Sequence, residues 1–539
     1  MLDFDCHHEI KPSSSSGDGT QKISADAATV VDLRSHRGRI STIPVLEINK
    51  DNLNQLWTYL LVSIKNSSFI SVDLELSGLG IEKGWLSQSI NDRYKLIRKS
   101  AQSRAILSIG LTTFQLVKRK ETETKKRIKY KCQVFNILTL CASAFTVEPD
   151  GLQFLASHSF DFNRLIKLGI PYASHDCGAS GKNGFSGGYG TYSQKDSLRI
   201  LWNEILCSSI PIAFHNGLID LAFIYEHFYS TLPETLDDFV VNLSDWFMLD
   251  GDEGRPGLYD SKYLAEFVAR MNASYLEYVF RKCSSRAYIS VDFDSDLLRT
   301  NFINGINNDQ KSFEQINCEL PEEFREPVII PRSVNDKDAQ MICKKYAAFG
   351  FCPSNRRCYL SHNIDLVLDL EEQKQSKVRE RRKRRYDYAS KLLRSDETEP
   401  KGAESTSCSR KCSENSEDAT NGHLNGSIEN EIEMNNTEAQ LRSFDDFKRA
   451  AIGCHRAGMD SFMTGFAVIF MSRMAILRTG ELNPEHGNRL PLRGKPIPLL
   501  IHRSEFTMPT AEHCTQWERI SIERERRRHL KNIQLNGIS

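Results

Sequence analysis

The sequence lacks the segments that direct a chain out of the cell or into a membrane. Its 539 residues begin with the polar stretch MLDFDCHHEIKPSSSSGDGT, and no run of 18 apolar residues follows. There is no excess of either charge, because 70 basic side chains balance 70 acidic ones, so net charge indicates no class of partner. We therefore expect a soluble protein that is not secreted.

Closely spaced cysteine pairs are also missing. The 14 cysteines are mostly single and scattered, which excludes a disulfide-rich scaffold and fits a reducing compartment. The exceptions are Cys343, Cys352 and Cys358, which fall within one short segment.

The distribution of charged residues divides the chain into segments. Residues 374–394 hold ten Lys or Arg against two acidic residues, a net charge of +8, whereas residues 395–440 hold eleven acidic against three basic residues, a net charge of −8. Such a polar, acidic segment cannot bury a core and is predicted to be disordered. The predicted segments are a disordered N-terminus 1–40, the first part of a folded domain 41–285, an insertion without a recognisable pattern 286–337, a Cys/His cluster 338–366, the basic run 374–394, the acidic linker 395–440, the last part of the folded domain 441–505 and a C-terminal tail 506–539.

The periodicity of the folded parts indicates an α/β protein. A helical pattern begins near Val45, with Asp51 as its N-cap, and the apolar strand FISVDLEL follows at 69–76. Two β-rich runs, RAILSIGLTTFQLV and KYKCQVFNILTL, flank a charged loop, and IPIAFHNGLIDLAFIYEHF is typical of a strand, a turn and a helix. A hairpin of strands followed by alternation with helices predicts a mixed sheet flanked by helices.

The strand at 69–76 carries two acids in an otherwise apolar run. Asp73 and Glu75 are two residues apart and therefore project from the same face of the strand. Two neighbouring carboxylates raise each other's pKa, and a divalent cation between them removes that repulsion. Carboxylate oxygens are ligands that suit Mg²⁺ or Mn²⁺. The alternative is an acidic pair on an exposed strand face.

Two further acids lie at the starts of apolar helices. Asp220 stands in HNGLIDLAFIY, and Asp460 stands in CHRAGMDSFMTGFAVIF with His455 five positions earlier. An acid in the first turn of a helix also complements the helix dipole, so each position has a simpler structural interpretation when it is taken alone.

Taken together, these residues resemble the DEDDh class of 3′–5′ exonucleases. The surrounding stretches ELSGLG, HNGLID, LYDSKYLAEF and HRAGMDSFMTG are similar to its deadenylase branch, which contains the CAF-type and poly(A)-specific ribonucleases. The resemblance covers about residues 40–285 and 441–505, and it implies a ribonuclease H-like fold. The chain departs from that family in the 240 residues between Asp220 and Asp460, although closing a longer loop costs only about 0.6 kcal/mol per doubling of its length.

The resemblance also implies a mechanism. RNA would be hydrolysed from its 3′ end with release of 5′-AMP, with two Mg²⁺ or Mn²⁺ ions about 4 Å apart at the scissile phosphate. His455 would accept the proton of the attacking water. The residues assigned to metal binding are Asp73, Glu75, Asp220 and Asp460.

Three polar residues are candidate substrate contacts. Ser77 follows the acidic pair, and His215 and Asn216 form the turn before Asp220. For His215 and Asn216 the alternative is capping of the helix. Asp260, in LYDSKYL, is expected to support the site rather than bind a metal.

The insertion contains a candidate structural zinc site. Cys343, Cys352, Cys358 and His362 have the spacing C-x8-C-x5-C-x3-H, which provides four tetrahedral ligands and leaves no open position. So short a unit has almost no core, so its folding should depend on the metal. The spacing resembles CCCH zinc fingers that bind single-stranded RNA. The aromatic residues Phe349, Phe351 and Tyr359 either stack on bases or form the finger's own small core.

The finger and the basic run narrow the resemblance to nuclear deadenylases of the target-of-early-growth-response type. That resemblance implies a nuclear localisation signal, localisation in the nucleus, Cajal bodies and nuclear speckles, maturation of the 3′ ends of small nuclear RNAs, and contact with small nuclear ribonucleoproteins. The alternative for the basic run is an RNA-contacting or solvated helix. The residues of the predicted signal are Lys377, Arg379, Arg381, Arg382, Lys383, Arg384 and Arg385.

Three other functions compete with this one. The chain could be a non-catalytic RNA-binding regulator, a deadenylase of messenger RNA poly(A) tails, or a DNA exonuclease of the same superfamily. The completeness of the acidic set argues against the first, because degenerate members lose ligands. Digestion of RNA and DNA oligomers side by side separates the last.

Overall fold

The computed structural model describes ten parts of the chain, all of which belong to the compact unit Arg37–Ser539. The predicted disorder of residues 1–40, the acidic linker up to residue 440 and the residue His455 lie outside the described parts. The described ranges are 42–80, 89–117, 128–173, 194–249, 255–284, 289–293, 315–319, 341–354, 357–395 and 456–536.

The described residues form a mixed central sheet. Its order is β7-β6-β2-β3-β4-β1-β9, and β5 and β8 also pair with β4. Strands β2, β3 and β4 are antiparallel neighbours, whereas β6 is parallel to β2 and β7 is parallel to β6. The strands are β1 Thr42–Ile48, β2 Phe69–Leu76, β3 Ile106–Leu116, β4 Ile128–Cys141, β5 Ile170–Tyr172, β6 Ile212–Phe214, β7 Leu258–Asp260, β8 Ile289–Phe293 and β9 Gln315–Glu319.

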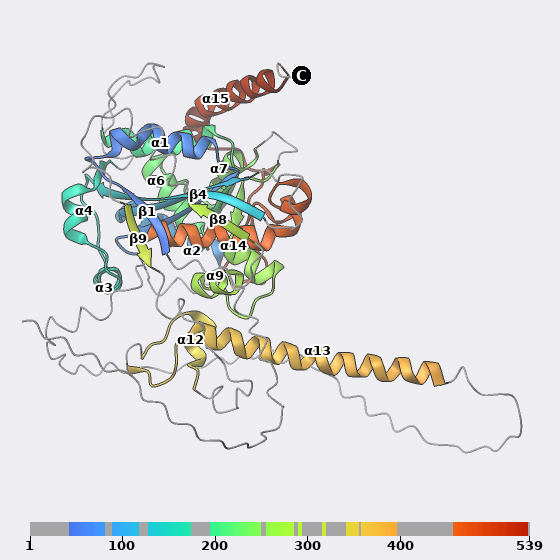
Figure 1. Ribbon diagram of the computed structural model, residues 1–539. Coiled ribbons are helices and arrows are strands. Elements are labelled where there is room, and N and C mark those ends of the chain that lie inside the picture. Colours follow the sequence, from blue (N-terminus) through green and yellow to red (C-terminus); the bar gives the residue numbers. More distant parts are fainter. Residues whose placement is uncertain are drawn as a thin grey trace, which may run out of the picture. The chain divides into compact units, whose positions relative to one another are not determined.

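Helices cover both faces of this sheet, as the sequence predicts for an α/β fold. One apolar core joins the sheet to α1 (Leu53–Lys65), α2 (Ile90–Ser103), α5 (Ser197–Cys207), α6 (Leu218–Phe228) and α7 (Leu236–Phe247). The second core lies on the opposite face and joins the sheet to α9 (Leu276–Ser284) and α14 (Ala457–Thr479). Figure 1 shows α1 and α14 on opposite sides of the strands. Helices α3 (Pro149–Ser157) and α4 (Phe162–Leu168) follow β4.

One expectation about regular structure needs correction. The pattern near Val45 is not helical, because Thr42–Ile48 forms β1 between β4 and β9, and α1 begins only at Leu53 with Asn52 as its N-cap. A short apolar run fits a strand or a helix equally well. Helix α14 is long and apolar enough by length and composition to span a membrane, but 72% of its most apolar window is buried within the protein.

Parts of the insertion belong to the folded unit. Strand β8 pairs in parallel with β4, and β9 pairs antiparallel with β1, so residues after 285 extend the central sheet. Helix α12 (Lys344–Phe349) lies in the Cys/His segment, and the 32-residue α13 (Ile364–Ser395) carries the basic run. After β7, a short helix, α8 (Ser261–Tyr263), leads into a π-helical turn at Leu264–Val268.

The segment predicted as a C-terminal tail contains a docked helix. Strands β10 (Arg489–Leu490) and β11 (Leu499–Leu500) form a small hairpin, and α15 (Ala511–Asn536) follows. The Arg524 side chain is 7% exposed and donates to the carbonyls of Leu206 and Trp246. Because these are core residues of α5 and α7, the first part of α15 belongs to the domain.

Candidate active site

The two faces of β2 place its acidic pair. Val72 and Leu74 point into the core shared with α1 and α5. The alternate residue Ser71 faces the other way and donates from Oγ to the carbonyl of Ser461 on α14, at 2.6 Å. Because side chains alternate along a strand, Asp73 and Glu75 lie on the face that α14 covers.

Two glycines, Gly110 and Gly458, allow α14 to begin directly against the sheet. Gly110 of β3 is the partner of Asp73 in the strand register. A Cβ atom at Gly110 would lie 1.7 Å from the carbonyl oxygen of Ala457, the first residue of α14. The N–H of Gly458 also donates to Oδ1 of Asn136 on β4, at 3.2 Å. These close contacts bring the first turn of α14, which carries Asp460, to the acids of β2.

Three of the four predicted metal ligands meet here. A carboxylate oxygen from each of Asp73, Glu75 and Asp460 lies within 4.8 Å of the others. Asp73 and Glu75 are half-buried, and Asp460 is 9% exposed. Asp220 is not part of that cluster, but its charge reaches Asp73.

Burial and mutual repulsion raise the pKa values of the acids at this site. Burial raises the pKa of Asp73 well above its usual value, and the carboxylates of Asp460, Asp220 and Glu75 raise that pKa further, in that order. Burial also raises the pKa of Asp220 to about 7, and its own N–H and that of Leu74 act against this shift. A divalent ion would remove the repulsion, and an all-carboxylate donor set fits Mg²⁺ or Mn²⁺.

Asp260 supports the turn that presents Asp220. Its carboxylate accepts hydrogen bonds from the N–H groups of Gly217, Lys262 and Tyr263, at 2.9 to 3.0 Å. This agrees with the predicted supporting role. Burial nevertheless raises the pKa of Asp260 to about 6.

The candidate substrate contacts have different surroundings. His215 lies on the turn before α6 and contacts Oγ of Ser261 through Nδ1 at 2.7 Å, and burial lowers its pKa to about 3. Asn216 is exposed with a positive φ of 63°. Neither caps α6 by its side chain, since the N-cap is Gly217 without a side-chain bond.

Ser77 does not have the surroundings of a substrate contact. The residue is fully buried, and its Oγ donates to the carbonyl of Thr146 at 2.7 Å and accepts from the N–H of Ala105 at 3.0 Å. The hydroxyl is thus bonded within the protein, and the predicted role of Ser77 in substrate binding stays a prediction. Ser77 ties the end of β2 to the start of β3, because a hydroxyl can satisfy two backbone groups that β-pairing leaves free.

Glu148 is a residue near the site that the sequence did not indicate. Its carboxylate accepts from the N–H groups of Leu79 and Gly80, at 3.0 and 2.7 Å, in the loop that follows the acidic pair. Arg104 holds the same carboxylate through an ion pair of 2.6 Å. No local motif marks Glu148, because its partners lie 68 and 69 positions earlier in the chain.

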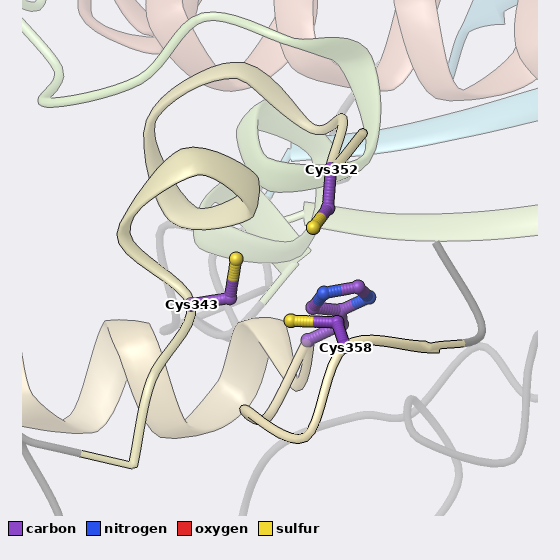
Figure 2. Close-up of side chains that lie close together, drawn as sticks. Cys343, Cys352 and Cys358 are labelled. Carbon is purple, nitrogen blue, oxygen red and sulfur yellow. The ribbon is translucent and has the colours of Figure 1, made fainter. Parts of the chain in front are cut away.

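The Cys/His cluster is assembled as predicted. The four ligand atoms of Cys343, Cys352, Cys358 and His362 lie within 4.8 Å of one another. Figure 2 shows the three sulfur atoms directed toward a common space. Tetrahedral zinc with Zn–S bonds of about 2.3 Å would place its ligands about 3.8 Å apart, which is compatible with four ligand atoms that all lie within 4.8 Å of one another. The buried Nε2 of His362 has no hydrogen-bond partner among the described residues, as expected of a metal ligand.

The three aromatic residues of this segment are exposed. Phe349, Phe351 and Tyr359 are 75%, 67% and 92% accessible. They therefore do not form a small core of the finger, which was one of the two interpretations of these residues. Their rings are available to an external partner.

The sequence pattern of the CAF1 family ribonucleases matches residues 48–187 and 189–468. The chain belongs to this family. The matched range contains the whole acidic cluster, Asp220 and the Cys/His segment. Membership confirms the resemblance to CAF-type ribonucleases, and the roles of the four acids and of His455 stay predictions.

Individual relatives match a smaller part of the chain. Poly(A)-specific ribonuclease PNLDC1 of Mus musculus is 28% identical over 139 residues, which cover 24% of this chain and 26% of that protein. The pre-piRNA 3′-exonuclease trimmer of Bombyx mori is 27% identical over 133 residues, which cover 24% of this chain and 25% of that protein. The matches thus span about a quarter of the length of these curated relatives. The metal-bound structure of S. pombe Pop2p has a TM-score of 0.32 at 15% identity, and the match covers 45% of this chain and 82% of that one.

Proposed function

We propose that this CAF1-family chain is a 3′–5′ exoribonuclease that removes adenosines from the 3′ end of RNA and releases 5′-AMP. The observation that carries the proposal is the convergence of Asp73, Glu75 and Asp460 within 4.8 Å, beside Asp220. Four acids gathered at one partly buried place repel one another, and the family assigns such a set to divalent ions that bind phosphate.

The roles of the chain's own groups follow from their positions. The four acids would hold two Mg²⁺ or Mn²⁺ ions, which when bound supply positive charge at a phosphate and lower the pKa of a coordinated water. His455 would accept a proton from that water, because an imidazole titrates near neutral pH. It directly precedes Arg456, from which the chain enters the helix that carries Asp460. Glu148 and Asp260 orient the two loops beside the acids.

The adenosine preference rests on the relatives. The mouse protein is named a poly(A)-specific ribonuclease, and the silkworm protein is named a 3′-exonuclease of pre-piRNA. The second name supports an alternative, a 3′-exonuclease that trims RNA without regard to the terminal base. A non-catalytic RNA-binding regulator is less well supported, because Asp73, Glu75, Asp220 and Asp460 are all present.

The inserted segment is proposed to be a CCCH zinc finger that binds single-stranded RNA. Support comes from the four converging ligand atoms, the unpartnered Nε2 of His362 and the three exposed aromatic rings. Bases stack on such rings, with about 1–3 kcal/mol per base. The order of the ligands in the sequence, Cys-Cys-Cys-His, is the order that the finger requires.

The cellular role is proposed from the basic run and from the resemblance that it carries. The basic residues 377–385 are exposed on α13, as a nuclear localisation signal must be to meet its receptor. We infer that the protein acts in the nucleus, in Cajal bodies and nuclear speckles, on the 3′ ends of small nuclear RNAs within their ribonucleoproteins. Deadenylation of messenger RNA would require the same chemistry.

The test is digestion of three 5′-labelled oligomers with Mg²⁺: RNA ending in oligo(A), the same RNA ending in oligo(U), and DNA ending in oligo(dA). We expect stepwise shortening of the first from its 3′ end, with 5′-AMP as the product. Equal trimming of oligo(A) and oligo(U) would support the general 3′-exonuclease instead. Faster trimming of the DNA would contradict the assignment to RNA. Sequencing of RNA 3′ ends crosslinked to an Asp220→Asn variant would then identify the cellular substrate.

A further inference from the structure

Charged contacts join the finger segment to the sheet domain. Arg281 of α9 donates from Nε and from a terminal nitrogen to the two carboxylate oxygens of Asp365 on α13, at 2.6 and 2.7 Å. One residue on, Lys282 donates to Glu371 at 2.8 Å, and the hydroxyl of Tyr278 donates to the same carboxylate. Arg281 and Asp365 are only 16% and 13% exposed. We call these pairs the docking contacts; a bidentate pair of this kind fixes orientation as well as distance.

Apolar packing continues across the same boundary. Ile364, the first residue of α13, is 1% exposed and belongs to the core that contains α9 and α14. The ring of Tyr275 lies 6.1 Å from that of Tyr346 on α12, and Tyr346 stacks on His362 with ring centroids 4.4 Å apart. The candidate zinc ligand His362 therefore stacks on Tyr346, which in turn lies beside Tyr275 of the sheet domain. The finger and the start of α13 are held to the sheet domain by both polar and apolar contacts.

Beyond these contacts, α13 presents a long basic surface. The helix has 32 residues and would be about 48 Å long. Residues 371–390 are nearly all exposed, and the stretch 374–394 carries the net charge of +8. Two tyrosines stand among the basic residues, Tyr386 and Tyr388, at 75% and 70% exposure. Positive charge with interleaved aromatic rings is the surface that single-stranded nucleic acid prefers, because phosphates pair with the cations and bases stack on the rings.

We propose that the docking contacts attach this basic surface of α13 to the nuclease domain, so that one chain holds the upstream part of a single-stranded RNA while it trims the 3′ end. The proposal rests on the proposed exoribonuclease function. The basic run would then bind substrate in addition to any role in localisation. A substrate of a few nucleotides cannot occupy the active site and α13 together, so only long RNA gains from the attachment.

The experiment compares two substrates of the full-length protein, a 5′-labelled A3 trimer and a 30-nucleotide RNA ending in oligo(A). The docking variants are Arg281→Asp, Asp365→Arg and the double swap Arg281→Asp/Asp365→Arg. The surface variant is Arg381→Glu/Arg382→Glu, and its matched control is Arg519→Glu/Arg526→Glu on α15, which changes the net charge equally. Bound zinc is measured in every variant. All assays use purified protein, so that an effect of the substitutions on nuclear import cannot influence the kinetics.

We expect the surface variant and both single docking variants to raise KM for the long RNA by about tenfold and to change kcat/KM for the trimer by less than about twofold. The double swap should restore most of the long-RNA KM, because it re-forms the ion pair. For the surface variant, the slope of log KM against log salt should fall by about 1.4, since two phosphate contacts are lost at about 0.7 each.

Three results would overturn the proposal. The surface variant could leave the KM for long RNA unchanged, even with zinc retained. The α15 control could raise that KM equally, which would assign the effect to net charge alone. The double swap could fail to recover the long-RNA KM while it retains zinc and trimer activity. If the unmodified protein trims neither substrate, the proposed function itself fails, and that result is distinct from the other three.

Discussion

At the scale of single residues, the carboxylates of the candidate site repel one another. Asp73 experiences burial and three neighbouring carboxylates, all of which raise its pKa. Asp260 accepts hydrogen bonds from three backbone N–H groups, whereas Asp73, Glu75 and Asp460 each bring a carboxylate oxygen within 4.8 Å of the others. Under the proposed metal-binding role of these acids, the stability of the protein should depend on pH and on metal together.

The first prediction concerns that dependence. Burial raises the pKa of Asp220 to about 7 from an ordinary value of 3.8, so the folded, metal-free protein binds this proton more tightly than the unfolded chain does. The stabilisation is complete below about pH 3.8 and is lost as the pH rises toward 7. Metal-free protein should therefore unfold at a lower temperature at pH 7.5 than at pH 5.5. Added Mg²⁺ should raise that temperature most at the higher pH, because only ionised acids bind it.

The measurement is a series of thermal unfolding curves with and without Mg²⁺. In Asp220→Asn both the pH dependence and the Mg²⁺ effect should shrink, because the titrating ligand is gone. A Mg²⁺ stabilisation of equal size at both pH values would contradict the assignment of these acids to metal binding.

At the scale of elements, the site depends on how closely α14 approaches β3. Gly110→Ala would place a methyl group 1.7 Å from a backbone oxygen of α14, which no side-chain rotation can relieve. We expect a loss of roughly 3 kcal/mol or more in unfolding free energy, together with loss of activity, since Asp460 would be displaced. Chemical denaturation measures the change. Gly151→Ala is the matched control, because its Cβ would meet nothing closer than 3.9 Å, and an unperturbed Gly110→Ala protein would refute the packing argument.

The loop at Leu79 and Gly80 gives a second prediction at this scale. Glu148→Ala removes the acceptor of both loop N–H groups and leaves Arg104 without this partner. The loop begins directly after the strand that carries Glu75, so we expect kcat/KM on oligo(A) to fall by about tenfold, equivalent to about 1.4 kcal/mol. Glu148→Gln should lose less, because one acceptor oxygen remains. Steady-state kinetics with both variants measures the effect. An unchanged kcat/KM in Glu148→Ala would exclude a role of Glu148 in orienting the active-site loop.

The sequence predicted the elements whose signals are local. The strand with Asp73, the turn at 215–217 and the helix with Asp460 were all recognisable, because each combines an apolar period with a polar interruption. Helices α2 and α7 were not predicted, and β1 was mistaken for a helix, because a short or weakly apolar segment depends on distant partners for its conformation. The role of Glu148 and the burial of Ser77 were not predictable for the same reason.

At the scale of the whole molecule, the insertion is integrated with the domain that it interrupts. Strands β8 and β9 extend the central sheet on the way out of the domain, and the docking contacts secure α13 to α9. The chain between α13 and α14 need only bring Asp460 back to the sheet, and a long connection does this at small entropic cost.

Zinc should be present once per chain. We expect metal analysis of the purified protein to find one zinc, and Cys352→Ser to lose it, because a site with three ligands binds far more weakly. Cys514→Ser is the matched control, since Cys514 is an exposed cysteine outside the cluster. The sheet domain should stay folded in Cys352→Ser, and trimming of an A3 trimer should persist. Full zinc content in Cys352→Ser would exclude this cluster as the site.

The account depends most on the cation-binding role of Asp73. The most direct measurement is Mg²⁺-dependent trimming of 5′-labelled oligo(A) RNA by the unmodified protein, by Asp73→Asn and by the control Asp150→Asn, whose acid is exposed on α3. We predict that Asp73→Asn lowers the rate on the order of 10³-fold or more, several kcal/mol of lost stabilisation, with RNA binding retained. Asp150→Asn should trim normally. Full activity of Asp73→Asn would contradict the assignment of the acidic cluster to catalysis.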